Sequence, residues 1–358
     1  MSSVLSIRRD QPRFAWRVAC GIQALGYLAG VRYDLLFRDA EAIVTAFRKG
    51  SPAMRAMFGP DVELPKPCWA PINYGHLNTL GCPLAFPENS EVGVQPICAS
   101  IREGIELLSR SIEFTSSGLY PFYLELHETL RRAMPDQGVI FGNFKAEGPI
   151  TTAWLLRGQG FFTDLFDEPE LVDRYLHLVT DSVVKYKLLG RSDDASSSTD
   201  PVGVADDGAA MIPPRLWPRF VVLHLDRYYR LQGRGPRRAH IENLVSEHLP
   251  FLDELRLSHY DPSVSPSLTP ALIRDNCHVR FQWRLNSTHY PAMTVEQIER
   301  WVYEAVADGA CAVATDIEPW MCNEPNVKKV HAFIEAAKRV GRWLEAGRAP
   351  EDLTERIA

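Results

Sequence analysis

The chain has 358 residues, of which 46% are hydrophobic and 23% charged, and its formal net charge is −6. This composition is that of an ordinary globular protein, and the length suffices for one large α/β domain or two smaller ones. The negative charge and the lack of a basic cluster with interleaved aromatic residues exclude a general affinity for nucleic acid or anionic membranes. No apolar run approaches the roughly 20 residues of a membrane span, and residues 1–10 lack the apolar segment of a signal peptide.

The seven cysteines are odd in number, scattered along the chain, and free of any Cys-x-x-Cys motif. This pattern is not a disulfide framework, so we expect reduced thiols in a cytoplasmic protein, most of them small core residues. They are Cys20, Cys68, Cys82, Cys98, Cys277, Cys311 and Cys322.

Residues 1–60 are expected to form a helical extension packed on the domain that follows, because Ala15 to Leu28 and Arg38 to Phe47 carry apolar residues at helical spacing. Prolines at seven positions break any long helix between residues 60 and 98. We expect this loop-rich segment to lie over the carboxyl ends of the strands predicted below, with Tyr74 and His76 as substrate-binding residues. The alternative is a surface loop whose polar groups are already satisfied.

From residue 100 onward, segments with helical and strand character alternate. The predicted helices are 100–108, 120–134, 153–156, 167–189, 215–231, 243–252, 270–276, 294–308 and 326–344. The predicted strands are 138–142, 202–205, 236–243, 255–260, 278–285 and 310–316, with two earlier candidates at 66–70 and 111–114.

Repeated alternation of strand and helix predicts a parallel sheet with crossover helices. The strands are apolar throughout, as expected when helices cover both faces. Eight such strands would close a (β/α)8 TIM barrel, formed by residues 61–358 as the catalytic domain. An open doubly wound sheet is the alternative, and the G-x-G-x-x-G turn that it would need is absent.

Polar residues gather at the carboxyl ends of the predicted strands, which form one rim in a barrel and carry the chemistry there. Asp206 and Asp207 are catalytic candidates, one of which contacts substrate or acts as an acid or base, or else one caps the following helix and the other binds backbone amides. Glu147 and Asn286 are candidate substrate-binding residues. The remaining polar strand ends are His240 with Glu242, Tyr260 with Asp261, and Asp316 to Cys322.

His240 and Glu242 stand two residues apart on one predicted strand, so their side chains point to the same face. An imidazole and a carboxylate could bind one metal ion there, with Cys322 as a third ligand. The alternative is that Glu242 is solvated or paired with Arg237, Arg238 or Arg284.

Several segments together resemble the uroporphyrinogen decarboxylase superfamily. They are Glu147-Gly148-Pro149 before a helix, residues 165–179, Ala205-Asp206-Asp207-Gly208 with residues 211–220, and residues 324–340. The resemblance covers residues 135–342 well and residues 60–110 loosely. It implies a (β/α)8 barrel and one of two activities, either cofactor-free decarboxylation of a tetrapyrrole or zinc-dependent methyl transfer between corrinoids and thiols or other acceptors.

Two features favour the methyltransferase branch. Residues 67–74 contain no arginine, whereas the decarboxylases have an arginine-rich motif that binds substrate carboxylates. The methyltransferases carry His-x-Cys and a later Cys, which here correspond to His240, Glu242 and Cys322. The chain departs from this pattern at Glu242. A carboxylate there conserves charge but leaves zinc more Lewis-acidic than a thiolate does, which favours an oxygen-bearing substrate such as a methyl ether.

The sequence therefore predicts a zinc-dependent methyltransferase that moves a methyl group between a small substrate and a corrinoid or thiol acceptor. The cobalamin is expected to come from a separate corrinoid protein, and the enzyme is expected to be a monomer or homodimer. The alternatives are a cofactor-free decarboxylase and a non-catalytic barrel that has lost the metal.

Overall fold

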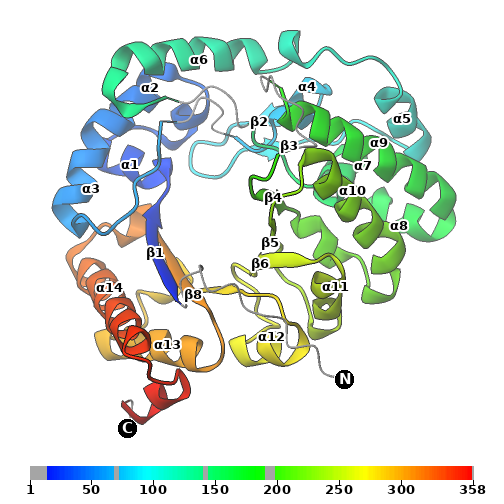
Figure 1. Cartoon of the computed structure of the whole chain (residues 1–358). Helices are drawn as coiled ribbons and strands as arrows, with labels where there is room; N and C mark the ends of the chain where they lie inside the picture. The colour runs from blue at the N-terminus through cyan, green and yellow to red at the C-terminus, as the bar shows by residue number, and fades with distance from the viewer. Residues whose placement is uncertain (1–13, 68–71, 140–143, 190–197, 357–358) are drawn as a thin grey trace.

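The computed structural model describes residues 14–67, 72–139, 144–189 and 198–356. Parallel strands and many helices make this a mixed α/β protein (Figure 1). The strands of the two parallel sheets are β1 (Ala15–Cys20), β4 (Val202–Ala205), β5 (Arg237–His240), β6 (Leu257–Asp261), β7 (Gln282–Arg284) and β8 (Ala312–Ile317). A separate antiparallel pair, β2 (Leu84–Ala85) and β3 (Gly93–Val94), lies in the loop-rich segment.

The α-helices surround the parallel strands in Figure 1. In the first half of the chain they are α1 (Ile22–Ala29), α2 (Ala40–Thr45), α3 (Ser51–Phe58), α4 (Gly75–Thr79), α5 (Ile101–Leu108), α6 (Tyr120–Ala133), α7 (Pro149–Arg157), α8 (Gly160–Asp167) and α9 (Pro169–Lys187). In the second half they are α10 (Leu223–Gln232), α11 (Leu249–Glu254), α12 (Pro270–Asn276), α13 (Val295–Ala307) and α14 (Glu324–Glu345).

The parallel strands form a continuous series. One sheet has the order β4-β5-β6 and the other β7-β8-β1. The parallel bridge between Tyr260 and Phe281 joins the two sheets, and a second bridge adds Glu63 beside Ala19. The described residues therefore give the order β4-β5-β6-β7-β8-β1 followed by the segment at Glu63, and no closed barrel is present among them.

The expected helix at the start of the chain is wrong for residues 15–20, which form β1 and pair in parallel with β8. Trp16, Val18 and Cys20 alternate with Ala15, Arg17 and Ala19, and this period of two is the mark of a strand. The apolar residues of α1 follow directly after Gly21, so strand and helix together imitate one helical pattern. The division of the chain at residue 60 stays a prediction.

Neither of the two early predicted strands, at 66–70 and 111–114, is seen among the described residues. Residues 111–113 are coil and a 3-10 turn starts at Phe114, so the strand predicted at 111–114 is wrong. The candidate at 66–70 lies partly outside the described residues, and its described part, residues 66 and 67, is coil. Most of the strand predicted at 138–142 also lies outside them. The other predicted strands are present, although β7 is shorter than expected.

Most helices occur where the sequence predicts them, because their ends carry local signals. Ser100 caps α5 by accepting the amide of Glu103, and Thr294 forms a capping box with Gln297 at the start of α13. Pro169 occupies the first turn of α9, where its missing N–H costs no hydrogen bond.

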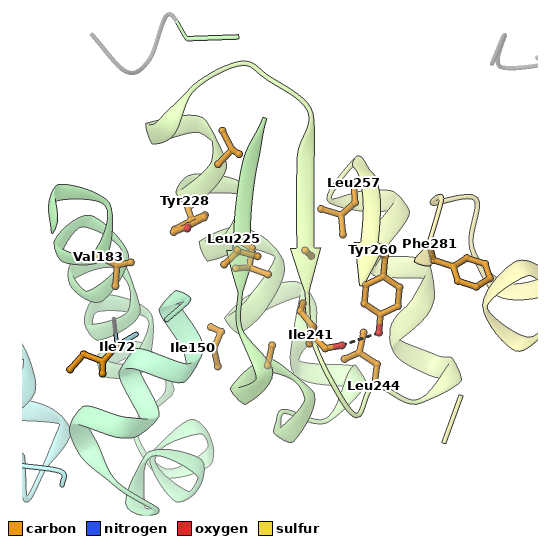
Figure 2. Close-up of a cluster of buried hydrophobic side chains, with 14 of the residues drawn as sticks. Ile72, Ile150, Val183, Leu225, Tyr228, Ile241, Leu244, Leu257, Tyr260 and Phe281 are labelled. Atoms are coloured by element: carbon orange, nitrogen blue, oxygen red, sulfur yellow. Dashed lines mark hydrogen bonds between the residues drawn. The ribbon is translucent and has the colours of Figure 1, made fainter. Parts of the chain in front are cut away.

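A hydrophobic core fills the space between the strands and the helices around them. Figure 2 shows part of it beside β4, β5 and β6, where Leu225 and Tyr228 of α10 pack near the strands and Leu257 and Tyr260 come from β6. The buried hydroxyl of Tyr260 donates a hydrogen bond of 3.0 Å to the carbonyl of Ile241. This bond holds the chain just after β5 against β6, where the candidate site begins.

Candidate functional site

A cluster of polar side chains lies at the carboxyl ends of β4, β5 and β6. His240 ends β5, and its Nδ1 lies 2.9 Å from Oδ2 of Asp261, which ends β6. Its Nε2 faces two other carboxylates, at 3.6 Å from Oε1 of Glu242 and 4.0 Å from Oδ1 of Asp207. The imidazole is therefore fixed on one side and faces an acidic environment on the other.

Asp261 is held by two basic partners. It receives the hydrogen bond of His240, and Nη2 of Arg284 lies 3.1 Å from the same oxygen. Arg284 also reaches Asp316 on β8, at 3.0 Å. Burial alone would raise the pKa of Asp261, but His240 and Arg284 outweigh burial and hold it well below its usual range. Asp261 is thus an ionised anchor for the imidazole.

The contact with Asp261 also changes the pKa of His240. Burial alone would lower its pKa, but the hydrogen bond to Asp261 and the charges of Asp261 and Asp207 raise it. A histidine whose charged form is favoured in this way is suited to donate a proton from Nε2.

Asp206 and Asp207 have different roles. Asp206 is fully buried and accepts hydrogen bonds from the amides of Ile150 (3.1 Å) and Thr151 (2.6 Å), so it caps α7 across a long stretch of sequence. Asp207 is half-exposed and accepts the amide of Glu242 at 2.8 Å, which fixes the chain after β5. Both aspartates bind backbone amides, as the structural alternative expects, but Asp206 caps the earlier helix α7 and not the following one. Of the two, Asp207 is the one with a contact to His240.

Glu147 joins the cluster because the turn that carries it packs tightly against β4. The amide of Gly148 donates to the carbonyl of Ala205 at 2.6 Å, and a Cβ on Gly148 would lie 2.4 Å from Cγ of Asp206. Only glycine fits this close approach. Burial raises the pKa of Glu147 to about 7, and the charges of Asp207 and Asp206 add to this effect. Glu147 can therefore exchange a proton near neutral pH.

The loop-rich segment contributes Tyr74 but not His76. Burial raises the pKa of Tyr74, and the charges of Glu147, Glu91 and Asp207 add to this effect, so the phenol lies within electrostatic range of the cluster. His76 is only 1% exposed, and its Nε2 lies 2.9 Å from Oγ of Ser182. It packs in the core between α4 and α9, away from the cluster.

Asn286 and Cys322, two further predicted site residues, have other contacts. Asn286 accepts the amide of Thr288 at 3.0 Å and so caps the turn after β7. The thiol of Cys322 makes a long contact of 3.9 Å with the carbonyl of Glu318. Burial raises its pKa to about 11, and the charge of Glu318 adds to this effect. Within the described part of the chain, no contact joins Cys322 to His240 or Glu242.

A cavity of about 460 Å³ opens beside His240 and Asp261. Its lining comes from the inner faces of β4, β5, β6, β7 and β1, together with Asn73, Lys145, Ala146 and Lys187. This volume lies in the range of small-molecule sites. His240 and Asp261 are thus placed where a bound molecule could reach them.

Sequence reasoning missed the connection between the cluster and the cavity. Asp261 stood among the polar strand ends, but its bonds to His240 and Arg284 join residues far apart in the chain. One signal was present in the sequence, since charged residues at alternate positions, such as Arg238 and His240, occur in strands otherwise expected to be apolar.

Comparison with known proteins supports the fold. A solved structure described as a methyltransferase from Methanosarcina mazei is similar, with a TM-score of 0.66, 17% identity, and coverage of 92% of this chain and 94% of that chain. At this identity the likeness shows the fold alone. No family model matches the chain, and no curated protein matches it. Among the described helices, none has the length and apolar character needed to cross a membrane.

Proposed function

We propose that this chain is a methyltransferase that binds a small methylated substrate at the carboxyl ends of its parallel strands. The observation that carries the proposal is His240, which Asp261 anchors and which lines a cavity. The likeness to a methyltransferase structure over nearly the whole of both chains supports it.

The proposal includes a (β/α)8 barrel in the uroporphyrinogen decarboxylase superfamily. The strand order β4-β5-β6-β7-β8-β1, followed by the segment at Glu63, supports a barrel because each strand neighbours the next in sequence order.

The chemistry assigned to the chain's own residues is proton transfer and orientation. When a methyl group leaves an ether oxygen for an acceptor, the oxygen keeps the bonding electron pair and needs a proton. His240 can supply that proton from Nε2 while Asp261 holds the ring. Glu147, with a pKa near 7, can return a proton to the site.

Zinc at His240, Glu242 and Cys322 stays a prediction from the sequence resemblance. A histidine that binds metal through one nitrogen usually donates the other N–H to a carboxylate, and His240 has such a partner in Asp261. Cys322 has no contact with this pair, and within the described residues no three His, Cys, Asp or Glu side chains are grouped so that they could hold a metal ion. The described arrangement therefore does not fit the predicted ligand set, and no step above depends on it.

A cofactor-free decarboxylase is the second candidate. Residues 67–74 contain no arginine, but the cavity is lined by Arg17, Arg238, Lys145 and Lys187. Cations at these positions could hold a substrate carboxylate. Release of carbon dioxide without an acceptor would identify this activity.

The proposed function is tested by a screen of O-, N- and S-methyl compounds, with free cob(I)alamin or a thiol as acceptor. Methylated acceptor is measured by mass spectrometry for wild type and His240→Ala. We expect at least one donor to be demethylated by wild type and not by the variant. Absence of product with every donor, or equal product from both proteins, would contradict the proposal.

Metal content is measured in the same preparations, together with Glu242→Cys. If zinc is bound as the resemblance implies, Glu242→Cys retains the metal and its turnover shifts toward thiol acceptors, because the site becomes softer. Wild type without stoichiometric zinc, or an unchanged preference in Glu242→Cys, would remove zinc from the proposal and leave the role of His240 to the first screen.

A further inference from the structure

The cavity beside the parallel strands has an unusual lining. Inward-facing positions of a packed barrel usually carry bulky branched side chains that fill the interior. Here the inner-face positions that line the cavity are small or polar, namely Arg17, Gly203, Ala205, Arg238, His240, His259, Asp261 and Gln282. The interior at this level is therefore a chamber and not a core.

Gly203 provides independent evidence of open space. It lies in β4 and has no side chain. A Cβ added to it would meet no heavy atom within 4 Å. Its neighbour two residues on, Ala205, also lines the cavity and is small. The inner face of β4 thus leaves room for a ligand.

The charge of the lining is strongly one-sided. Four cationic side chains line the cavity, Arg17, Lys145, Lys187 and Arg238, and Asp261 is the one carboxylate among its lining residues. Asp261 is already bound by His240 and Arg284. Apart from Arg17, which pairs with Glu63, the cations are therefore not neutralised by acidic residues of the described lining.

Of these four cations, Arg17 alone has an acidic partner among the described residues. Arg17 is paired with Glu63 at 2.7 Å, and the ammonium of Lys187 lies over the ring of Tyr228. Within the part of the chain that the structure describes, no acidic side chain pairs with Lys145 or Arg238. Both side chains are exposed to solvent, so an anion can reach them.

The neighbourhood of Arg238 is electropositive. In the sheet Arg238 pairs with His259 of β6, and the pKa of His259 is lowered by burial and further by the charge of Arg238. Burial disfavours a charge of either sign, so only the contribution of Arg238 favours an anion beside His259.

We infer that this chamber binds a small organic anion, a carboxylate or a phosphate ester, whose acidic group lies against Arg238 and Lys145. Guanidinium and ammonium groups are the usual partners of such oxyanions. Arg238 precedes His240 by two residues on the same face of β5, so the two side chains are roughly 7 Å apart along the strand. That separation suits a substrate with a few carbon atoms between its acidic group and its reacting group.

The orientation toward His240 rests on the proposed function, whereas binding of the anion does not. A decarboxylase or a methyltransferase would use the same chamber, and a chain without either activity would still bind the anion.

The inference is tested by isothermal titration calorimetry of the full chain with succinate, citrate and inorganic phosphate at constant ionic strength. Three variants are compared with wild type. Arg238→Ala removes a positive charge from the chamber. Gly203→Leu fills the chamber without requiring an unusual backbone conformation. Arg110→Ala is the control, because it removes an exposed arginine that does not line the chamber and that pairs with Glu106. Circular dichroism confirms that each variant is folded.

We expect saturable binding of at least one of these anions to wild type and to Arg110→Ala, and a dissociation constant at least tenfold higher in both Arg238→Ala and Gly203→Leu. Stronger binding of phosphate than of either carboxylate would identify a phosphate ester as the ligand class, and the reverse order a carboxylate. No saturable binding to wild type, or equal binding to all four proteins, would overturn the inference. Neither outcome depends on methyl transfer.

Discussion

The two ends of one short strand carry opposite charge environments. At the carboxyl end of β5, His240 is surrounded by Asp207, Glu242 and Asp261. Two residues earlier, Arg238 points into a chamber lined by cations. The first environment stabilises a protonated imidazole and the second stabilises a bound anion. We therefore assign reaction to the rim, meaning the polar cluster around His240, and substrate binding to the chamber.

The largest effect is expected from His240→Ala, compared with His259→Ala on the neighbouring strand. Both histidines line the chamber, but only His240 is anchored by a carboxylate on one side and faces carboxylates on the other. We expect His240→Ala to lower kcat by on the order of 10²–10⁴, as for loss of a general acid. His259→Ala should change kcat by less than about tenfold. Steady-state rates with a donor from the screen measure this, and a similar loss in both variants would contradict the division.

Asp261→Ala tests how much the rim depends on its anchor. The carboxylate is 16% exposed and holds both His240 and Arg284. Its loss removes the hydrogen-bonded partner of His240 and one of the two carboxylate partners of Arg284, and it should lower the free energy of unfolding by about 2 kcal/mol. Asp226→Ala is the matched control, since Asp226 pairs with Arg230 and Arg237 nearer the surface and should cost about 1 kcal/mol or less. Chemical denaturation of both variants measures the difference, and equal losses would argue against an anchor.

Glu147→Gln tests the acidic character of the rim through pH. The folded pKa of about 7 exceeds the ordinary value of 4.5. The contribution of Glu147 to stability is therefore present below pH 4.5 and is lost as pH rises through about 7, by on the order of 3 kcal/mol. Burial also raises the pKa of Asp207, which acts in the same direction. Buried histidines such as His76 and His224 have lowered pKa values and act in the opposite direction, so the test is the difference between the two proteins. We expect the unfolding free energy of wild type to fall relative to that of Glu147→Gln between pH 5 and pH 8. A constant difference over this interval would contradict the assignment.

Asp206→Ala separates support from chemistry within the rim. Asp206 caps α7 with two hydrogen bonds but does not face His240. Its loss should cost about 2 kcal/mol of stability and leave anion binding in the chamber unchanged. Asp39→Ala, at the half-buried cap of α2, should cost about 1 kcal/mol. If Asp206→Ala abolished anion binding in a folded protein, the rim and the chamber would not be separate.

The sequence predicted those parts of the site that depend on local spacing. His240 and Glu242 lie close together, 3.6 Å apart, because they are two residues apart in the chain. The predicted strand is shorter than expected, since β5 ends at His240 and Glu242 follows it in coil. Gly148 before α7 and the capping residue Thr294 before α13 likewise mark in the sequence where these helices begin. The helices with clear caps were predicted for the same reason.

The remaining parts depend on contacts between distant segments. Asp206 caps a helix more than fifty residues earlier, and Arg284 joins Asp261 to Asp316 across two strand pairs. β1 was predicted as a helix because its pattern runs into that of α1. Each of these features is decided by which strand lies beside which, and one sequence does not reveal that.

The central claim, that the rim reacts and the chamber binds, is tested most directly by steady-state kinetics of Arg238→Ala beside His240→Ala, with a methylated acid as donor. We predict that Arg238→Ala raises KM at least tenfold and leaves kcat within about threefold of wild type, whereas His240→Ala lowers kcat. A loss of kcat with unchanged KM in Arg238→Ala would contradict the claim.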